Sequence, residues 1–252
     1  MEQRTASESR TFVILGGTGG IGAEVVRQLR AAGSNVLAVA RGEERLAALA
    51  AESGAETLVA DASDFDAVEK AAEKAREAWG GLDGIVNCVG SVLLRPAHMT
   101  SAAAWRETVS QNLDTAFAAV RAAGKHLGSG GSVVLVSTAA VRSGLPNHEA
   151  IAAAKGGVEG LVRSADATDG PQGVRFNAVA PGLVRTPLTE RITSNEKAAE
   201  ASRSLHVMGR FGEAAEVASA ICWLLDPAQG WVTGQVIGID GGLGSARTMP
   251  RG

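Results

Sequence analysis

The sequence predicts a doubly wound α/β fold in which one parallel sheet of about seven strands carries helices on both faces. Short, continuously apolar runs alternate along the chain with longer Ala-rich stretches whose apolar residues recur at helical spacing. A glycine-rich turn joins the first apolar run to the first helical stretch. The 252 residues contain no proline-rich linker and no repeat. We therefore expect a single domain over residues 11–252, preceded by a flexible polar segment, residues 1–10.

The predicted strands are the apolar runs, because continuous hydrophobicity is typical of strands that are covered on both faces. They are residues 12–15, 36–40, 57–60, 84–87, 132–137, 174–179 and 235–239. The stretches between them are rich in helix formers with an apolar period of about 3.6 residues, so each can cover a sheet face. The predicted helices are residues 23–32, 43–53, 65–79, 101–127, 150–167 and 213–225.

One long stretch, residues 183–208, shows no clear period and has Pro181 and Pro187 near its start. Long irregular segments in compact domains are often functional, so this stretch is a candidate substrate-covering loop. A surface loop without a function is the alternative.

Composition and charge exclude several classes of protein. Hydrophobic residues make up 45% and charged residues 20%, as in ordinary globular proteins. No apolar run reaches the roughly 18 residues of a membrane span, and the first residues lack a signal peptide, so we expect a cytoplasmic protein without membrane contacts. A net charge of −3 with scattered Lys and Arg argues against nucleic acid. The His and Cys residues lack ligand spacing, so no metal site is expected.

The glycine-rich turn, residues 15–22, reads Leu-Gly-Gly-Thr-Gly-Gly-Ile-Gly and predicts a dinucleotide site. Gly16, Gly20 and Gly22 omit Cβ atoms where a chain turns sharply, approaches a pyrophosphate and packs a helix against a sheet. The backbone N–H groups that open the helix would face the phosphates. Taken alone, the motif also fits a tight turn without a ligand.

Further motifs follow in order and make residues 11–242 resemble the short-chain dehydrogenase/reductase family. The glycine turn is similar to the family's Thr-Gly-x-x-x-Gly-x-Gly, with Leu15 in place of the threonine. Residues 87–90 resemble its Asn-Asn-Ala-Gly segment, and residues 177–186 resemble its nicotinamide-side segment. Gly-Gln and Asp-Gly-Gly within residues 234–242 resemble its C-terminal signature. The resemblance implies a Rossmann-like fold and a nicotinamide dinucleotide cofactor.

The choice of cofactor depends on the end of the second predicted strand, where an acidic residue would bind both ribose hydroxyls and repel a 2′-phosphate. Ala40 occupies that position and Arg41 follows it. Since a guanidinium can bind a 2′-phosphate through paired charge-assisted hydrogen bonds, we predict NADP(H). The alternative is that Arg41 is a solvated surface residue and NAD(H) binds without discrimination. The cofactor-binding residues that the motifs and this argument imply are Gly16, Thr18, Gly19, Gly20, Ile21, Gly22, Arg41, Asp61, Ala62, Asn87, Val89, Gly90, Lys155, Pro181, Gly182, Val184 and Thr186.

At the catalytic positions the chain departs from the family pattern. In the family, a Ser hydroxyl holds the carbonyl, a Tyr exchanges its proton, and a Lys four residues later lowers the Tyr pKa and binds the ribose. Lys155 and Thr138 match the lysine and serine positions, and Asn112 matches a helical asparagine. The resemblance implies that Thr138 orients the substrate, Lys155 the ribose, and Asn112 the helix and water near Lys155. The tyrosine position holds Ile151, and the chain contains no tyrosine.

Isoleucine carries no titratable proton, and general acid catalysis contributes about 10² to 10⁴ in rate. Three explanations stay open. A histidine side chain titrates near neutrality, so His148 is a candidate acid, although an exposed loop histidine is the simpler interpretation. An iminium substrate already carries positive charge and accepts hydride without a protein acid. Alternatively no redox turnover occurs, and the protein is a nucleotide-binding partner or scaffold.

Among these, we expect an NADP(H)-dependent oxidoreductase that reduces a carbonyl or imine in a small organic substrate. The family resemblance also implies a homo-oligomer, a dimer or a tetramer.

Overall fold

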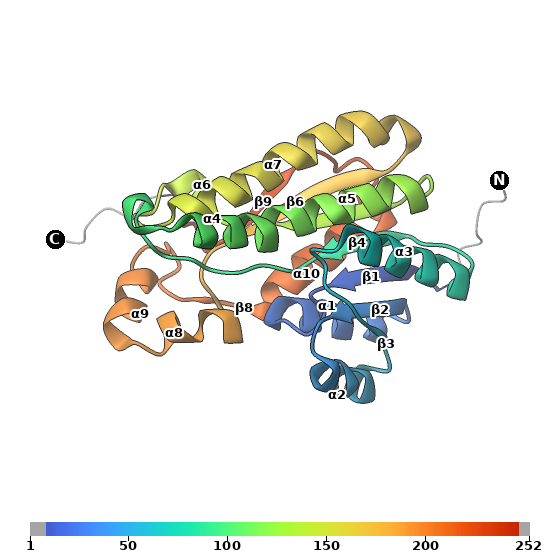
Figure 1. Cartoon of the computed structure of the whole chain (residues 1–252), viewed down its shortest axis with the longest axis horizontal. Helices are drawn as coiled ribbons and strands as arrows, with labels where there is room; N and C mark the ends of the chain where they lie inside the picture. Colours follow the sequence, from blue (N-terminus) through green and yellow to red (C-terminus); the bar gives the residue numbers. More distant parts are fainter. Residues whose placement is uncertain (1–8, 247–252) are drawn as a thin grey trace.

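A parallel sheet of seven strands, in the order β3-β2-β1-β4-β5-β6-β9, runs through the middle of the molecule. The computed structural model describes residues 9–246, so most of the predicted segment 1–10, and residues 247–252 at the other end, lie outside the described residues. The strands are β1 Thr11–Leu15, β2 Asn35–Ala40, β3 Glu56–Val59, β4 Gly84–Asn87, β5 Ser132–Val136, β6 Arg175–Pro181 and β9 Val236–Ile239. Helices cover both faces of the sheet (Figure 1), which confirms the predicted fold class.

The helices bury two hydrophobic clusters, one on each face of the sheet. Val13 and Leu15 of β1 belong to the cluster under α3, α5 and α7, whereas Phe12 and Ile14 belong to the cluster under α1, α2 and α10. Side chains along a strand alternate between faces, so a strand covered on both faces is apolar throughout. The bounds are α1 Gly20–Ala31, α2 Glu43–Ser53, α3 Phe65–Trp79, α4 Ala102–Val109, α5 Thr115–His126, α6 Ala140–Ser143, α7 Glu149–Asp169 and α10 Ala214–Leu225. Short 3-10 turns lie at Ala97–Met99, Gly170–Gln172 and Pro227–Gln229.

The structure corrects two predicted elements. The single helix predicted over residues 101–127 is interrupted by a π-helical segment, Ser110–Asp114, between α4 and α5. The stretch 183–208, predicted to be irregular, is largely ordered. It contains β7 Val184–Arg185, the 3-10 turn Pro187–Thr189, α8 Glu190–Thr193 and α9 Glu196–Arg203, and β7 pairs with β8 Gly212–Glu213. Elements of one or two turns contain too few residues to show a hydrophobic period.

Among the described residues, no helix combines the length and the apolar character needed to cross a membrane.

His126, in the last turn of α5, makes stability depend on pH. Both ring nitrogens are buried and lack a hydrogen-bond partner among the described residues. Burial lowers the His126 pKa below its ordinary 6.5, and the charge of Arg76 lowers it further. The unfolded chain therefore binds a proton more readily than the folded chain, so the free energy of unfolding should fall as pH decreases through 6.5.

Urea unfolding between about pH 8 and about pH 5.5 measures this effect, since the histidine range lies above that of the carboxylates. The slope of stability against pH should be smaller in His126→Leu, while His98→Leu, at an exposed position, should keep it. An unchanged slope in His126→Leu would show that another group is responsible.

Candidate active site

The glycine-rich loop after β1 forms a cradle that leaves no room for a side chain at Gly16 or Gly22. Gly16 has a φ of +73°, and a Cβ built on it would lie 2.8 Å from the backbone nitrogen of Val89. A Cβ on Gly22 would lie 2.3 Å from the carbonyl oxygen of Gly16. Helix α1 begins at Gly20, with Gly19 as its N-cap. The unpaired N–H groups of this helix start provide a site for phosphate, so the loop fits a dinucleotide pyrophosphate.

A cavity of about 170 Å³ lies beside this loop, at the carboxyl ends of β2, β3 and β4. Besides Arg41, it brings together seven of the predicted cofactor residues: Gly16, Thr18, Gly19, Asp61, Ala62, Val89 and Gly90. Arg41 lines the same cavity, with its Nη1 3.8 Å from Asp61 Oδ2. Hydrogen bonds from the backbone N–H and hydroxyl of Ser63 lower the Asp61 pKa, and the charge of Arg41 lowers it further. This cavity can accept a nucleoside with its ribose next to the guanidinium of Arg41.

Arg45, in the first turn of α2, is a second guanidinium at this cavity that sequence reasoning missed. A Cβ on Gly42 would lie 3.2 Å from Arg45 Nε, so the absence of a side chain at Gly42 makes room for the arginine. The signal was present in the sequence, because Arg45 follows Arg41 by four residues at the start of a predicted helix.

A second cavity, of about 150 Å³, collects the predicted catalytic residues other than His148. Asn112, Thr138 and Lys155 line it, and so does Ile151. Lys155 is 6% exposed, and its Nζ donates a hydrogen bond to the carbonyl oxygen of Val136 at 2.7 Å. Burial lowers the Lys155 pKa to about 8, so the ammonium form still predominates at neutral pH. The predicted cofactor residues Ile21, Pro181, Gly182, Val184 and Thr186 line the same cavity.

Asn112 lies in the π-helical segment and joins that helix to the loop after β4. Its Oδ1 accepts from the backbone N–H of Ser91 at 3.2 Å, and its Nδ2 donates to Ser91 Oγ and to the Thr108 carbonyl oxygen, both at 2.9 Å. A Cβ on Gly90 would lie 3.0 Å from Asn112 Oδ1 and 3.5 Å from Lys155 Nζ. Gly90 therefore allows the asparagine and the lysine to approach, and π-helical turns of this kind are frequent at functional sites.

Asn87, a predicted cofactor residue, lines neither the nucleoside cavity nor the Lys155 cavity. It is 2% exposed, its Oδ1 accepts from the Val89 N–H at 3.1 Å, and its Nδ2 donates to Thr115 Oγ1 at 3.1 Å. The side chain thus fixes the loop after β4. Gly20 and Gly22 likewise shape the glycine loop without lining either cavity.

A third cavity, of about 410 Å³, adjoins the Lys155 cavity and shares Thr138, Ile151 and Pro181 with it. His148 lines this third cavity and is not part of the Lys155 cavity. Instead of lying in a free loop, His148 is the N-cap of α7, directly before the helix that carries Ile151 and Lys155. Its Nδ1 lies 2.7 Å from the Pro146 carbonyl oxygen, which can only accept, so Nδ1 carries the proton and Nε2 stays available.

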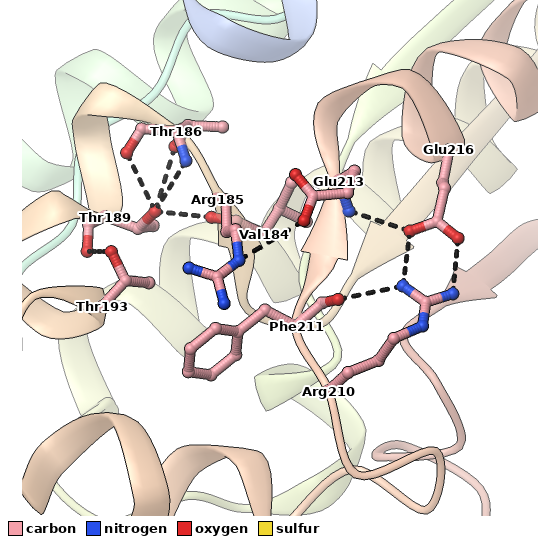
Figure 2. A network of polar contacts seen from close by, with 9 residues as sticks. All are labelled: Val184, Arg185, Thr186, Thr189, Thr193, Arg210, Phe211, Glu213 and Glu216. Atoms are coloured by element: carbon pink, nitrogen blue, oxygen red, sulfur yellow. Dashed lines mark hydrogen bonds and ion pairs between the residues drawn. The ribbon is translucent and has the colours of Figure 1, made fainter. Parts of the chain in front are cut away.

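The segment 183–208 lines this third cavity, and ion pairs and hydrogen bonds near its two ends hold it in place (Figure 2). Arg185 pairs with Glu213 at 3.3 Å across β7 and β8, and Arg210 binds Glu216 through two contacts of 2.6 and 2.8 Å. The hydroxyl of Thr189 donates to the Val184 carbonyl oxygen and meets the Thr186 hydroxyl at 3.1 Å. The turn that contains the predicted cofactor residue Thr186 is therefore held by Thr189.

The buried side chain of His206 holds the same segment together through two hydrogen bonds. Its Nε2 accepts from the Leu183 N–H at 3.1 Å, and its Nδ1 lies 2.8 Å from the Ser202 carbonyl oxygen. The bond joins residues 23 positions apart, and no sequence spacing indicated it.

The fold and the site together define a Rossmann-like α/β domain with a glycine-rich nucleotide loop. The chain belongs to the short-chain dehydrogenase/reductase family. A family model described as enoyl-(acyl carrier protein) reductase matches residues 16–244. Members of this family typically bind a nicotinamide cofactor, NAD(H) or NADP(H).

Curated relatives match over nearly the whole chain. A galactitol 2-dehydrogenase (L-tagatose-forming) of Cereibacter sphaeroides is 34% identical over 236 residues, which cover 91% of this chain and 92% of the relative. A tropinone reductase homologue of Arabidopsis thaliana is 33% identical over 250 residues, with 96% and 95% covered.

Solved structures agree with the fold. A short-chain type dehydrogenase/reductase from Mycobacterium ulcerans matches with a TM-score of 0.91 and 30% identity, covering 95% of this chain and 91% of that one. A short-chain dehydrogenase/reductase described as glucose/ribitol dehydrogenase, from Brucella melitensis, matches with a TM-score of 0.89 and 32% identity, with 95% and 98% covered.

Proposed function

We propose that this chain is an NADP(H)-dependent oxidoreductase that reduces a carbonyl or imine group of a small organic substrate without a tyrosine. The observation that carries the proposal is the meeting of Thr138, Lys155 and Asn112 at one cavity beside the glycine loop. Ile151, four residues before Lys155, lines the same cavity at the position where the family has its tyrosine. The site therefore keeps its hydroxyl, its lysine and its cofactor loop, and lacks only the usual acid.

The residues present fit a nicotinamide dinucleotide. The glycine cradle, in which a Cβ on Gly22 would meet the Gly16 carbonyl oxygen at 2.3 Å, would hold the pyrophosphate. Lys155 has one of its three N–H donors on Val136 and keeps donors for ribose hydroxyls. When bound, such a cofactor supplies or accepts a hydride. Arg41 and Arg45 favour NADP(H), since two guanidinium groups at one cavity suit a 2′-phosphate.

Replacing both guanidinium groups should remove the preference for NADP(H). Hydrogen bonds to charged groups contribute about 1.5 to 3 kcal/mol each, so Arg41→Ala with Arg45→Ala should weaken NADPH binding at least about tenfold. NADH binding should change little, because NADH lacks the phosphate that the arginines would bind. Fluorescence titration with both cofactors measures the two constants. Arg121→Ala removes a guanidinium that pairs with Asp66 and Glu69 on α3 and is the matched control. Equal weakening of both cofactors would contradict this role.

The protein's own groups can orient a substrate and supply a proton. Thr138 Oγ1 accepts from the Ala140 N–H at 3.3 Å, and its own proton can be donated to a carbonyl oxygen. We propose His148 as the proton donor for carbonyl substrates. Its Nδ1 is held by the Pro146 carbonyl, and protonated Nε2 would be the acid in the cavity that Thr138 also lines.

Removal of the His148 imidazole should lower the rate of ketone reduction much more than the rate of imine reduction. His148→Ala should lower ketone reduction by about 10²-fold or more, because general acid catalysis is worth about 10² to 10⁴. Reduction of a cyclic iminium should fall much less, since the substrate already carries the positive charge. Initial rates of NADPH oxidation measure both, with His98→Ala, an exposed histidine outside these cavities, as the control. Ketone reduction unaffected by His148→Ala would remove the histidine from the mechanism, and turnover of imines alone would favour the iminium route.

Ile151 favours a second candidate, a nucleotide-binding partner or scaffold without redox turnover. Such a protein would bind NADPH but would oxidise it with neither ketones nor imines. The same binding and rate measurements therefore separate the two candidates.

We also propose a homo-oligomer. Trp105 on α4 and Phe117 on α5 are 44% and 47% exposed, and exposed aromatic side chains are enriched at protein interfaces. Light scattering should give a dimer or tetramer mass, and a monomer at micromolar concentration would reject this proposal.

A further inference from the structure

The size and the lining of the 410 Å³ cavity beside Thr138 indicate which class of ligand it accepts. We propose that this cavity binds an uncharged, mainly hydrocarbon molecule with a single carbonyl group at the Thr138 end, and that it selects against carboxylates and phosphates. The inference rests on the proposed function, since it takes this cavity as the substrate site and names the class of substrate. The volume lies within the range of about 300 to 1,000 Å³ that is usual for sites of small organic ligands.

The walls of the cavity are mostly aliphatic. They come from the loop after β4, from the turn before α7, from the segment 183–208 and from the C-terminal loop, and include Val92, Leu94, Leu145, Ile192, Leu205 and Leu243. Within residues 9–246, no Asp, Glu, Lys or Arg lines the cavity. Ile151 extends the apolar wall up to the Lys155 cavity. An apolar ligand gains about 25 cal/mol for each Å² of apolar surface that such walls remove from water.

His206 does not provide a cation either. Its Nε2 accepts a hydrogen bond from the Leu183 N–H, and its Nδ1 faces the Ser202 carbonyl oxygen, which can only accept. These two bonds require the neutral ring with the proton on Nδ1, because a protonated Nε2 could not accept. Apart from the part of the cavity beside His148, a carboxylate or phosphate would therefore lose its hydration without gaining a fixed positive partner, which is costly.

The polar side chains of the cavity come from two places: Thr138 and His148 line it together with Ile151 of α7, and Thr189, Ser202 and His206 line it from the segment 183–208. Thr138 keeps a hydroxyl proton, and His148 keeps Nε2 because the Pro146 carbonyl holds its Nδ1. The Thr189 hydroxyl is already engaged with the Val184 carbonyl oxygen. One hydrogen-bonding end and an aliphatic remainder match a ligand with one polar atom, such as an alicyclic ketone. A permanently charged iminium matches these walls less well than a neutral carbonyl does.

Two probes of the same shape test the inference: camphor, an uncharged alicyclic ketone, and ketopinate, in which a carboxylate replaces one methyl group of camphor. Isothermal titration of the full chain, with and without NADP⁺, measures binding without turnover. We expect camphor to bind at least about tenfold more tightly than ketopinate, because the carboxylate would lose its hydration between walls in which no described Lys or Arg lies.

A positive charge placed in the wall should reduce or abolish the preference for camphor. Leu205 lines the cavity and is 48% exposed, so Leu205→Arg can be accommodated and brings a guanidinium to the carboxylate. The ratio of ketopinate to camphor affinity should rise at least about tenfold. Val59→Arg places the same charge on β3, at a residue that is 53% exposed and outside this cavity, and should leave the ratio unchanged.

Each outcome decides one of the two proposals. Camphor binding with the expected preference, but without NADPH oxidation by camphor or by any other ketone or imine, supports the cavity assignment and contradicts the redox function. Ketopinate binding as tightly as camphor to the unmodified chain overturns the cavity assignment, even if a different ketone is reduced. Absence of camphor binding overturns it as well.

Discussion

In a chain that carries His148→Ala, Ile151→Tyr is expected to raise ketone reduction by about 10² to 10⁴-fold, the usual contribution of general acid catalysis. Ile151 is 6% exposed and lines both the Lys155 cavity and the large apolar cavity, so a phenol ring can extend into existing space. Lys155, one helical turn later with its ammonium buried, would lower the phenol pKa and keep its proton transferable. Initial rates of NADPH oxidation with a ketone measure the gain.

The matched control is Ile151→Phe, which adds the same ring without the hydroxyl. It should give no gain, so any increase that it shares with Ile151→Tyr reflects packing or substrate fit. If both variants reduce ketones no faster than His148→Ala alone, position 151 is not the vacant acid position. A cyclic iminium should respond much less to Ile151→Tyr than a ketone.

Gly22→Ala should weaken NADPH binding roughly 5- to 150-fold, because the added methyl group must displace the glycine loop. Its Cβ would lie 2.3 Å from the Gly16 carbonyl oxygen and 3.2 Å from the Gly17 Cα, which are backbone atoms that no rotamer change can move. Overpacking of this kind costs about 1 to 3 kcal/mol. Calorimetric titration with NADPH and urea unfolding measure the two effects.

Gly160→Ala is the control for the same chemical change. Gly160 lies inside α7 with nothing within 4 Å of a built Cβ. It should leave NADPH binding unchanged and stabilise the fold by about 0.5 to 1 kcal/mol, the usual gain of Ala over Gly in a helix. Normal NADPH affinity in Gly22→Ala would show that the loop does not hold the pyrophosphate.

The regular elements could be predicted from the sequence because their patterns are local. Gly84–Asn87, Glu43–Ser53 and Phe65–Trp79 have the predicted bounds, since an apolar run or a full helical period marks each of them. The π-helical segment at Asn112 escaped prediction, because its residues keep the composition of a helix and only the hydrogen-bond register differs.

The candidate site was predictable where motifs mark it and hidden where it depends on tertiary contacts. Thr138 and Lys155 were predicted as site residues because their spacing matches the family pattern, and in the structure both line one cavity. The cavity wall formed by the segment 183–208 and the bond from Leu183 to His206 depend on pairing between residues far apart in the chain. No local pattern encodes such a bond.

Titration of the unmodified protein with NADPH and NADH tests the central claim most directly, because every proposed role in the site depends on a bound NADP(H). The predicted result is NADPH binding at micromolar concentration, more tightly than NADH, through the glycine loop, Arg41 and Lys155. Failure of NADPH to bind at micromolar concentrations would contradict the oxidoreductase account, and tighter binding of NADH would contradict the cofactor assignment.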